Sequence, residues 1–339
     1  MRERLFRLLG ALVLIVSLTG GWFGFGYQSF VSAPLTVAGE GVLVAVHPGA
    51  SLTAVARQLE QDGLISSARY FSWMARLSGS AHQLRAGEYR IEPGMTPRRL
   101  LQLMVEGKVH LYALTLVEGW NFRQMLDAVR TSPYLSQTLT GLTDREIMAR
   151  LGHPDEHPEG RFFPDTYHFP RQLSDEEFLR RAYRQMSEVL AYEWERRSEG
   201  LPLRTPDEAL TLASIVEKET GLASERPAIA GVFVRRLQKG IRLQTDPTVI
   251  YGLGFDFDGN LRRRDLTADT PYNTYTRSGL PPTPIAMPGR DSIHAALHPA
   301  PGEALYFVAR GDGSHHFSAT LDEHSRAVRY YQLKRGAPP

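Results

Sequence analysis

The hydrophobic and polar positions of this chain change their spacing along its length. A continuous apolar run lies near the N-terminus, over residues 8–27. Stretches of alternating apolar residues and stretches with apolar residues three and four apart then follow in turn, as far as residue 130. Alternation is typical of strands, and the three-to-four spacing is typical of helices. The pattern therefore predicts an α+β protein behind an apolar N-terminal helix.

The run over residues 8–27 is long enough to cross a membrane. It contains no charged residue, and twenty helical residues rise about 30 Å, which is the thickness of the hydrocarbon core of a bilayer. Arg2, Arg4 and Arg7 precede the run, which predicts that residues 1–7 stay in the cytoplasm. We expect a single-pass anchor in the plasma (inner) membrane, with the rest of the chain on the extracytoplasmic, periplasmic side.

A cleaved signal peptide is the alternative for this segment, with Val31-Ser32-Ala33 as the cleavage site. The apolar run is long for a signal peptide, and Pro34 would follow the cut. We therefore favour an uncleaved transmembrane anchor over residues 8–27, and we expect residues 28–41 to be a linker.

Three units with a strand pattern, a glycine-containing turn and a helical pattern follow this linker. The strands are expected at residues 42–46, 88–91 and 111–117. A Ser, Thr or Asn stands where each helix should begin, at Ser51, Thr96 and Asn121. Units of this size pack as small α+β layers, and a scaffold without a binding function is one interpretation of them.

Two further segments are distinctive. Residues 159–167 read Glu-Gly-Arg-Phe-Phe-Pro-Asp-Thr-Tyr, and their aromatics, Gly and Pro predict an ordered surface loop. A long helix with one apolar stripe and one charged face is predicted over residues 174–198.

The stretch 212–220, Leu-Ala-Ser-Ile-Val-Glu-Lys-Glu-Thr, completes a helix that we expect to begin after Thr205. The apolar residues of this helix recur along one stripe, which predicts burial on that side. Lys218 falls opposite the stripe, while Glu217 and Glu219 fall on its two flanks. The spacing of the apolar residues alone therefore barely separates the two carboxylates.

The residues downstream, from 241 onward, are dense in turns, tyrosines and amides, and we expect them to form the wall of a cleft. Aromatic rings can pack on the faces of sugars, and amides and hydroxyls can bind their N-acetyl and hydroxyl groups. The candidate binding residues of this wall are Gln244, Thr245, Tyr251, Tyr272, Asn273, Tyr275 and Phe317.

The composition and the absence of several motifs exclude some classes of function. The 339 residues suffice for two or three domains, and a net charge of +2 gives no indication of a nucleic-acid partner. The absence of cysteine excludes disulfides, thiolate nucleophiles and cysteine metal sites. The chain has no phosphate-binding loop, dinucleotide fingerprint or nucleophile elbow, and its histidines 315, 316 and 324 lack a recognised metal-ligand spacing. We therefore expect neither a metal nor a cofactor.

The remaining candidate chemistry is that of a carboxyl group. A glutamate at the end of an apolar helix is partly removed from water, which raises its pKa and keeps it protonated as a general acid. Such an acid can protonate a glycosidic oxygen. An ordinary charged helix end, without a catalytic role, is the alternative interpretation of the Glu-Lys-Glu triplet.

Four segments resemble the endolytic murein transglycosylases, the YceG-like family, in order and spacing. They are Ala213–Thr220, Leu243–Gly252, Tyr272–Tyr275 and Gly279–Pro282. The resemblance covers nearly the whole chain, and the segments are long and specific. In that family the catalytic acid is the second Glu of the Glu-Lys-Glu triplet, which corresponds to Glu219 here.

The resemblance implies further roles. Asp246 lies in the second segment and His315 begins the family's His-x-Phe, so both join the expected substrate-binding residues. Glu217 then becomes a neighbour that tunes Glu219 or caps. Residues 42–110 would form a LysM-like subdomain, and residues 111–335 a larger α+β catalytic domain.

The implied reaction is cleavage of the β-1,4 bond between N-acetylmuramic acid and N-acetylglucosamine within a peptidoglycan strand, leaving 1,6-anhydro ends. The implied partners are glycan strands, the membrane and, on nascent strands, the peptidoglycan synthases whose products it would shorten. A lysozyme-like hydrolase with Asp246 or Glu217 assisting, and a non-enzymatic wall-binding scaffold, are the alternatives.

Overall fold

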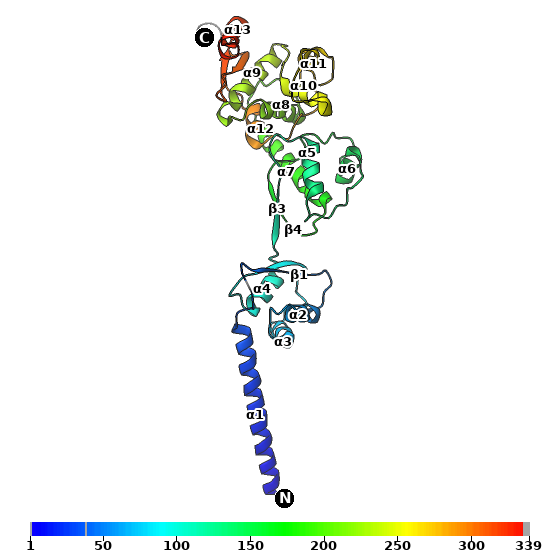
Figure 1. The fold of residues 1–339 in the computed structure, drawn as a ribbon, viewed down its shortest axis with the longest axis vertical. Coiled ribbons are helices and arrows are strands. Elements are labelled where there is room, and N and C mark those ends of the chain that lie inside the picture. Colours follow the sequence, from blue (N-terminus) through cyan, green and yellow to red (C-terminus); the bar gives the residue numbers. More distant parts are fainter. Residues whose placement is uncertain (1, 38, 335–339) are drawn as a thin grey trace. The chain divides into compact units, whose positions relative to one another are not determined.

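The computed structural model of the chain describes residues 2–37 and 39–334 (Figure 1). Residue 1 of the expected cytoplasmic segment, residue 38 of the expected linker and residue 335 of the expected catalytic domain lie outside the described residues. The chain contains both helices and short strands, so the predicted α+β class is confirmed.

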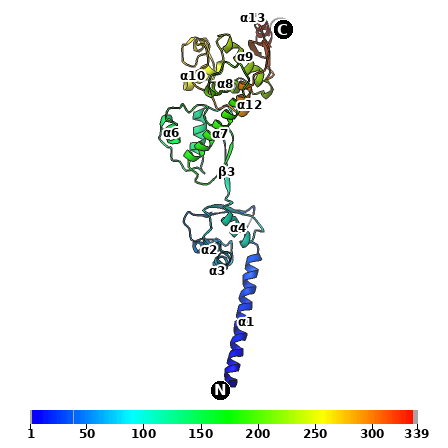
Figure 2. The ribbon, with the colours of Figure 1, turned by 180° about the vertical axis from the view of Figure 1, so that it is seen from behind.

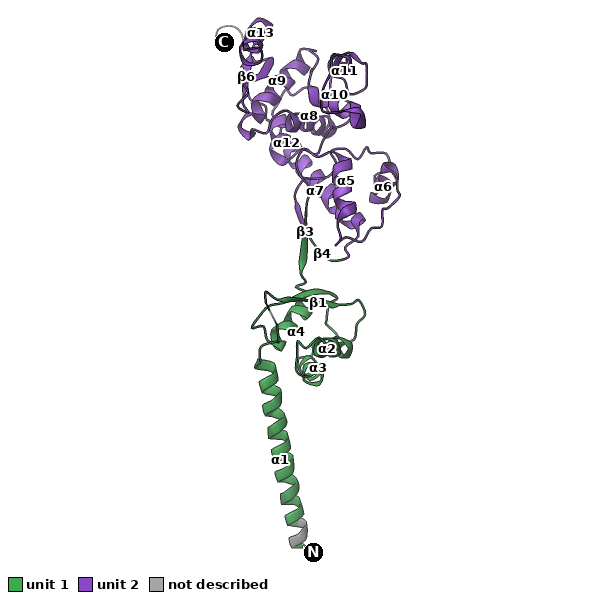
Figure 3. Cartoon of the chain, viewed as in Figure 1, with its two compact units in different colours: residues 1–112, 168–171 green, residues 113–167, 172–339 purple. Residues whose placement is uncertain are grey.

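The chain forms two compact units (Figure 3). Unit 1 contains residues 1–112 and 168–171, and unit 2 contains residues 113–167 and 172–339. The division runs through strands β3 (Leu111–Thr115) and β4 (Thr166–Pro170), which pair in a two-stranded sheet.

Unit 1 begins with the long helix α1 (Arg2–Ser32). Its part from Phe6 to Ser32 is long and apolar enough to cross a membrane, and its most apolar window is not buried within the protein. Farther along α1, Phe23 lies against Tyr70 and Trp73, with ring centroids 5.4 and 4.5 Å apart. The apolar N-terminal helix predicted from the sequence is therefore present as a candidate membrane anchor.

The C-terminal end of α1 is part of the hydrophobic core of unit 1. Phe30, Val31 and, just beyond the helix, Leu35 are each at most 6% exposed. The backbone N–H of Leu35 also donates to the carbonyl of Met95 at 2.7 Å. The first part of the expected linker is thus helical and packed.

The rest of unit 1 surrounds a small antiparallel sheet of β1 (Val42–Val46) and β2 (Gly87–Ile91). Helices α2 (Leu52–Gln61) and α3 (Ala68–Leu77) connect these strands and lie side by side in both views (Figures 1 and 2). Helix α4 (Pro97–Glu106) follows β2. The side chains of Ser51 and Thr96 accept backbone N–H groups at the starts of α2 and α4, which confirms both predicted N-caps.

Unit 2 is built around helix α8 (Pro206–Glu219), which packs against four other helices. These are α7 (Asp175–Glu195), α9 (Arg226–Gln238), α10 (Asp246–Leu253) and α12 (Arg290–Leu297). Every residue from Ala209 to Val216 is buried. The prediction of one buried stripe was therefore wrong, because this helix has neighbours all around it rather than one face in water.

Helices α5 (Phe122–Thr131) and α6 (Asp144–Leu151) precede α7, and the predicted N-cap Asn121 bonds to the N–H of Gln124. Residues 159–163 run from there toward α7. They do not form the predicted surface loop, because Glu159 is 3%, Phe162 0% and Phe163 8% exposed. Phe162 and Phe163 lie in the interior of unit 2, whereas Asp165 and Thr166 at the end of the motif are exposed.

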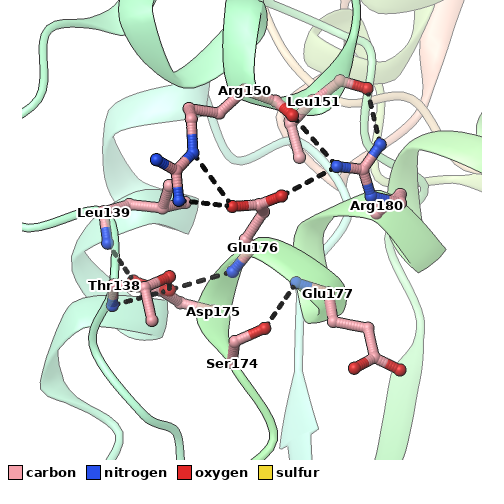
Figure 4. A network of polar contacts seen from close by, with 9 residues as sticks. All are labelled: Thr138, Leu139, Arg150, Leu151, Ser174, Asp175, Glu176, Glu177 and Arg180. Carbon is pink, nitrogen blue, oxygen red and sulfur yellow. Dashed lines mark hydrogen bonds and ion pairs between the residues drawn. The ribbon is translucent and has the colours of Figure 1, made fainter.

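Carboxylates at the start of α7 fix the segment before it (Figure 4). Asp175 accepts hydrogen bonds from the backbone N–H groups of Thr138 and Leu139, at 2.9 and 3.1 Å. Glu176 accepts from Arg150 of α6 at 3.0 Å and from Arg180 at 2.8 Å. Acceptors at a helix N-terminus suit its dipole, and here they also hold α6 against α7.

The remaining elements of unit 2 are two strands and several short helical segments, together with the C-terminal helix. The antiparallel strands β5 (Tyr306–Ala309) and β6 (His315–Ser318) pair Phe307 with Phe317, and helix α13 (Leu321–Tyr331) packs on them. The short helix α11 (Arg263–Thr267) follows α10. One-turn 3₁₀ segments stand at Ala223–Glu225 and Gly254–Asp256.

Candidate active site

The end of α8 carries the three charged residues of the Glu-Lys-Glu triplet. Thr205 caps the helix start, and Thr220 leaves the helix in an extended conformation, so Glu219 is its last residue. The buried body of α8 is tied to the proline-rich loop before α12, because the Ser214 hydroxyl accepts the N–H of Ile285 at 3.0 Å. A rigid, interior helix thus positions the triplet at its end.

The carboxyl group of Glu219 lies at a cavity of about 500 Å³. The Thr245 hydroxyl, which is buried, donates a hydrogen bond to it. Burial raises the pKa of Glu219 to about 7, and the nearby Asp246 raises it too, while the Thr245 hydrogen bond and the charge of His315 lower it. A carboxyl with this pKa is largely protonated just below neutral pH and can donate a proton.

Four of the predicted binding residues line the same cavity as Glu219. They are Gln244, Asp246, Tyr275 and His315. The Tyr275 hydroxyl donates to Asp246 at 2.6 Å, which fixes both side chains on the wall. Arg236 of α9 donates to the side chain of Gln244 at 3.3 Å and to the carbonyl of Leu243 at 2.9 Å.

His315 is held by a glutamate that the sequence analysis did not single out. One carboxylate oxygen of Glu225 accepts the backbone N–H of His315 at 2.9 Å, and the other lies 2.7 Å from its Nδ1. Both side chains are largely buried, at 12% and 14% exposure. Glu225 follows Glu219 by six residues, and only the tertiary fold brings it beside β6.

The other predicted binding residues lie elsewhere. Asn273 is fully buried, and its amide donates to three backbone carbonyls of the 265–268 turn, so it orders the chain rather than facing a ligand. Phe317 packs against the main core of unit 2. Tyr251 and Tyr272 line a different cavity, with their rings 4.9 Å apart.

The sequence model of the YceG-like family matches residues 44–330. This match covers most of unit 1 and nearly all of unit 2, including Glu219 and the other residues that line its cavity, apart from Gln332. The chain belongs to the YceG-like family.

Two relatives of this YceG-like chain have the same name. A protein of Bacillus subtilis called endolytic murein transglycosylase is 34% identical over 309 residues, which are 86% of this chain and 84% of that protein. One of the same name from Streptococcus pneumoniae is 28% identical, over 94% of this chain and 63% of that longer protein. The crystal structure of a YceG-like protein from Listeria monocytogenes is 33% identical, covers 84% of this chain and 98% of that one, and has a TM-score of 0.56.

In this YceG-like chain, Glu217 points away from the cavity and into the protein. Its carboxylate accepts the Ser292 hydroxyl at 2.7 Å and the N–H of Gly289 at 3.0 Å, and it lies 3.4 Å from Arg226. Its side chain is only 6% exposed. The two glutamates on either side of Lys218 therefore have different surroundings: Glu219 faces a cavity, and Glu217 joins α8 to the start of α12.

Histidines and carboxylates that could jointly hold a metal ion lie outside this cavity. Among the described residues, Glu193, His294 and His298 form such a group, with their candidate ligand atoms within 4.8 Å of one another. Both ring nitrogens of His298 already lie within 3.2 Å of backbone carbonyls. None of the three lines the cavity of Glu219.

Proposed function

We propose that this chain is a membrane-anchored lytic transglycosylase that cleaves peptidoglycan strands internally, between N-acetylmuramic acid and N-acetylglucosamine. The observation that carries the proposal is the position of Glu219, whose pKa is raised to about 7 and whose carboxyl faces an open cavity. The name of the relatives, endolytic murein transglycosylase, supports the same class of substrate.

The reaction needs one group that gives and then takes a proton. Protonated Glu219 donates its proton to the oxygen between the two sugars, and the bond from C1 of the muramoyl residue to this oxygen breaks. The C6 hydroxyl of the same muramoyl residue then attacks C1, and its proton passes to the Glu219 carboxylate. The 1,6-anhydro ring forms without water, and Glu219 is again protonated.

The lysozyme-like alternative needs a second carboxylate beside the acid. Glu217 does not suit that role, because its oxygens are engaged by α12 and Arg226. Asp246 lines the cavity and remains the candidate, although the hydroxyl of Tyr275 already donates to it. In the transglycosylase, an intramolecular hydroxyl replaces both the water and the second carboxylate, so the raised carboxyl of Glu219 at this cavity is sufficient for the reaction.

Mass spectrometry of the products separates these reactions. Isolated glycan strands without peptides should be converted into fragments with 1,6-anhydro-muramoyl ends, which are one water lighter than hydrolysis products. Reducing ends would establish a hydrolase instead. A protein that binds sacculi but releases no fragments would be the non-enzymatic scaffold.

We further propose that α1 is an uncleaved anchor that keeps the catalytic unit on the extracytoplasmic side. Cleavage after Ala33 would remove Phe30 and Val31 from the hydrophobic core of unit 1, and fully burying two such side chains contributes about 3–6 kcal/mol. The mass of the intact protein purified from the membrane fraction should equal that of a chain that still contains residues 8–27. A mature protein that begins at Pro34 would show that the segment is a signal peptide.

Unit 1 is the candidate for a LysM-like, glycan-binding subdomain. A cavity of about 560 Å³ supports this role, and its polar lining residues include His47, Ser51, Arg76 and His82. Such binding beside the membrane would direct the enzyme to nascent strands close to the synthases. If glycan strands keep their length when the protein is depleted, the placement near the synthases is contradicted. If an Arg76→Ala variant sediments with sacculi as the parent protein does, the glycan-binding role of unit 1 is contradicted.

A further inference from the structure

Unit 2 contains a second cavity, which is larger than the one at Glu219. Its volume is about 940 Å³, against about 500 Å³. The first turn of α5, the 157–159 segment and the residues from Tyr251 to Phe255 contribute to its lining, together with Tyr272 and Lys218. The reaction proposed above uses none of these residues.

The two cavities both border the end of α8 and the start of α10. In two pairs of consecutive residues, one residue lines the smaller cavity and the other lines the larger one. Glu219 and Asp246 line the smaller cavity, whereas Lys218 and Pro247 line the larger one. Glu219 therefore lines the smaller cavity, and the residue before it in the chain lines the larger one.

The lining of the larger cavity suits a sugar polymer that carries carboxylates. Phe255 is 83% exposed, and the guanidinium of Arg123 lies 3.7 Å from the centre of its ring. Lys218 and Arg130 add positive charge, and Asp127, Asp144 and the buried Glu159 are the acidic residues of the lining. The amides of Asn121 and Gln124 cap α5 and stand at the same wall.

A buried carboxyl group holds this wall in place. Glu159 is 3% exposed, accepts the N–H of Phe122 at 2.9 Å and accepts the hydroxyl of Tyr251 at 3.0 Å. The hydroxyl of Tyr272 lies 2.8 Å from that of Thr283. The two tyrosine rings are thus fixed from both sides, and the wall is formed before any ligand binds.

We propose that the larger cavity binds the glycan strand where it leaves the catalytic cavity, with Phe255 against a sugar ring and Arg123 paired with the carboxylate of a muramic acid residue. The proposal rests on the function proposed above. A strand cut internally has sugars on both sides of the broken bond, and a second cavity lined by the neighbours of Glu219 and Asp246 in the chain offers a place for those sugars. A muramic acid residue without its peptide has a free lactyl carboxylate, which is the anionic group that Arg123 would recognise, and the substrates of the test below are peptide-free for this reason.

Strands of different length test the proposal. The substrates are peptide-free glycans of two and of eight disaccharides, and the measured quantity is the ratio of kcat/KM for the long over the short one. Phe255→Ala and Arg123→Ala should each lower this ratio about tenfold, because only the long strand extends through the larger cavity. Arg184→Ala, an exposed change on α7 away from both cavities, should leave the ratio unaltered.

The outcomes separate this proposal from the proposed function. A ratio that stays at the parent value in folded Phe255→Ala and Arg123→Ala proteins would overturn the binding role of the larger cavity. An equal loss on both substrates would also overturn it, since that result indicates a role in the fold. Parent protein that forms no anhydro product from either substrate would instead refute the transglycosylase itself. Circular dichroism and thermal unfolding of each variant establish that it is folded.

Discussion

Replacement of Glu219 by glutamine should lower kcat by roughly 10²–10⁴-fold, the usual contribution of acid–base catalysis. Glutamine has nearly the same shape and can still accept the hydroxyl of Thr245, but it has no acidic proton. The rate of anhydro-product formation from isolated strands is the measurement. The variant should unfold at the parent temperature or slightly above it, because the buried charge is removed.

The pH dependence of the parent enzyme provides the control. Glu219 must be protonated to act as the donor, and its pKa is raised to about 7. The protonated fraction is therefore nearly constant at low pH and falls tenfold for each pH unit above about 7, so kcat should fall on the alkaline side. The residual activity of Glu219→Gln should lack this alkaline decline. A variant that cleaves at the parent rate, or that keeps the decline, would exclude Glu219 as the acid.

Replacement of Glu217 by leucine should lower the free energy of unfolding by about 3 kcal/mol, which is typical of breaking a buried, hydrogen-bonded ion pair. The change leaves the N–H of Gly289 and the hydroxyl of Ser292 without their acceptor, and it removes one of the partners of Arg226. Glu217→Gln keeps one acceptor oxygen and should cost less. Urea unfolding followed by circular dichroism is the measurement.

A matched control separates this effect from that of a surface carboxylate. Glu188 of α7 is exposed, and its replacement by leucine should alter the stability by no more than about 0.5 kcal/mol. If Glu217→Leu unfolds like the parent but loses activity, then Glu217 acts on the chemistry of Glu219, as the sequence analysis expected, and not by joining α8 to α12.

Local features of the fold could be predicted because they depend on residues that are close in sequence. Ser51, Thr96 and Asn121 cap their helices as expected, since the bond from cap to backbone spans only three residues. The burial of α8 was not predicted correctly, because it depends on α7, α9, α10 and α12. The buried position of Phe162 and Phe163 has the same origin: the composition of a segment does not show what covers it.

The candidate site shows the same limit. Gln244 and Asp246 stand beside Glu219, but Tyr251, five residues past Asp246 on α10, lies at the other cavity. Five residues correspond to about 7.5 Å along a helix and more than a full turn, so neighbours in a motif need not share a site. Glu225 and Glu159 were not identified as site residues, because their partners follow 90 and 92 positions later in the chain.

The join between α1 and the rest of unit 1 determines how far this unit can move from the membrane. A flexible linker over residues 28–41 would have an end-to-end distance of roughly 20 Å, and the segment after it could move over that distance. Instead, Phe30, Val31 and Leu35 are buried in the core of unit 1, so α1 is packed directly against the rest of this unit. If α1 spans the bilayer, unit 1 sits at a constant height above the membrane. Glycan strands at this height would encounter unit 1 at a high local concentration, whereas strands farther from the membrane would not contact it.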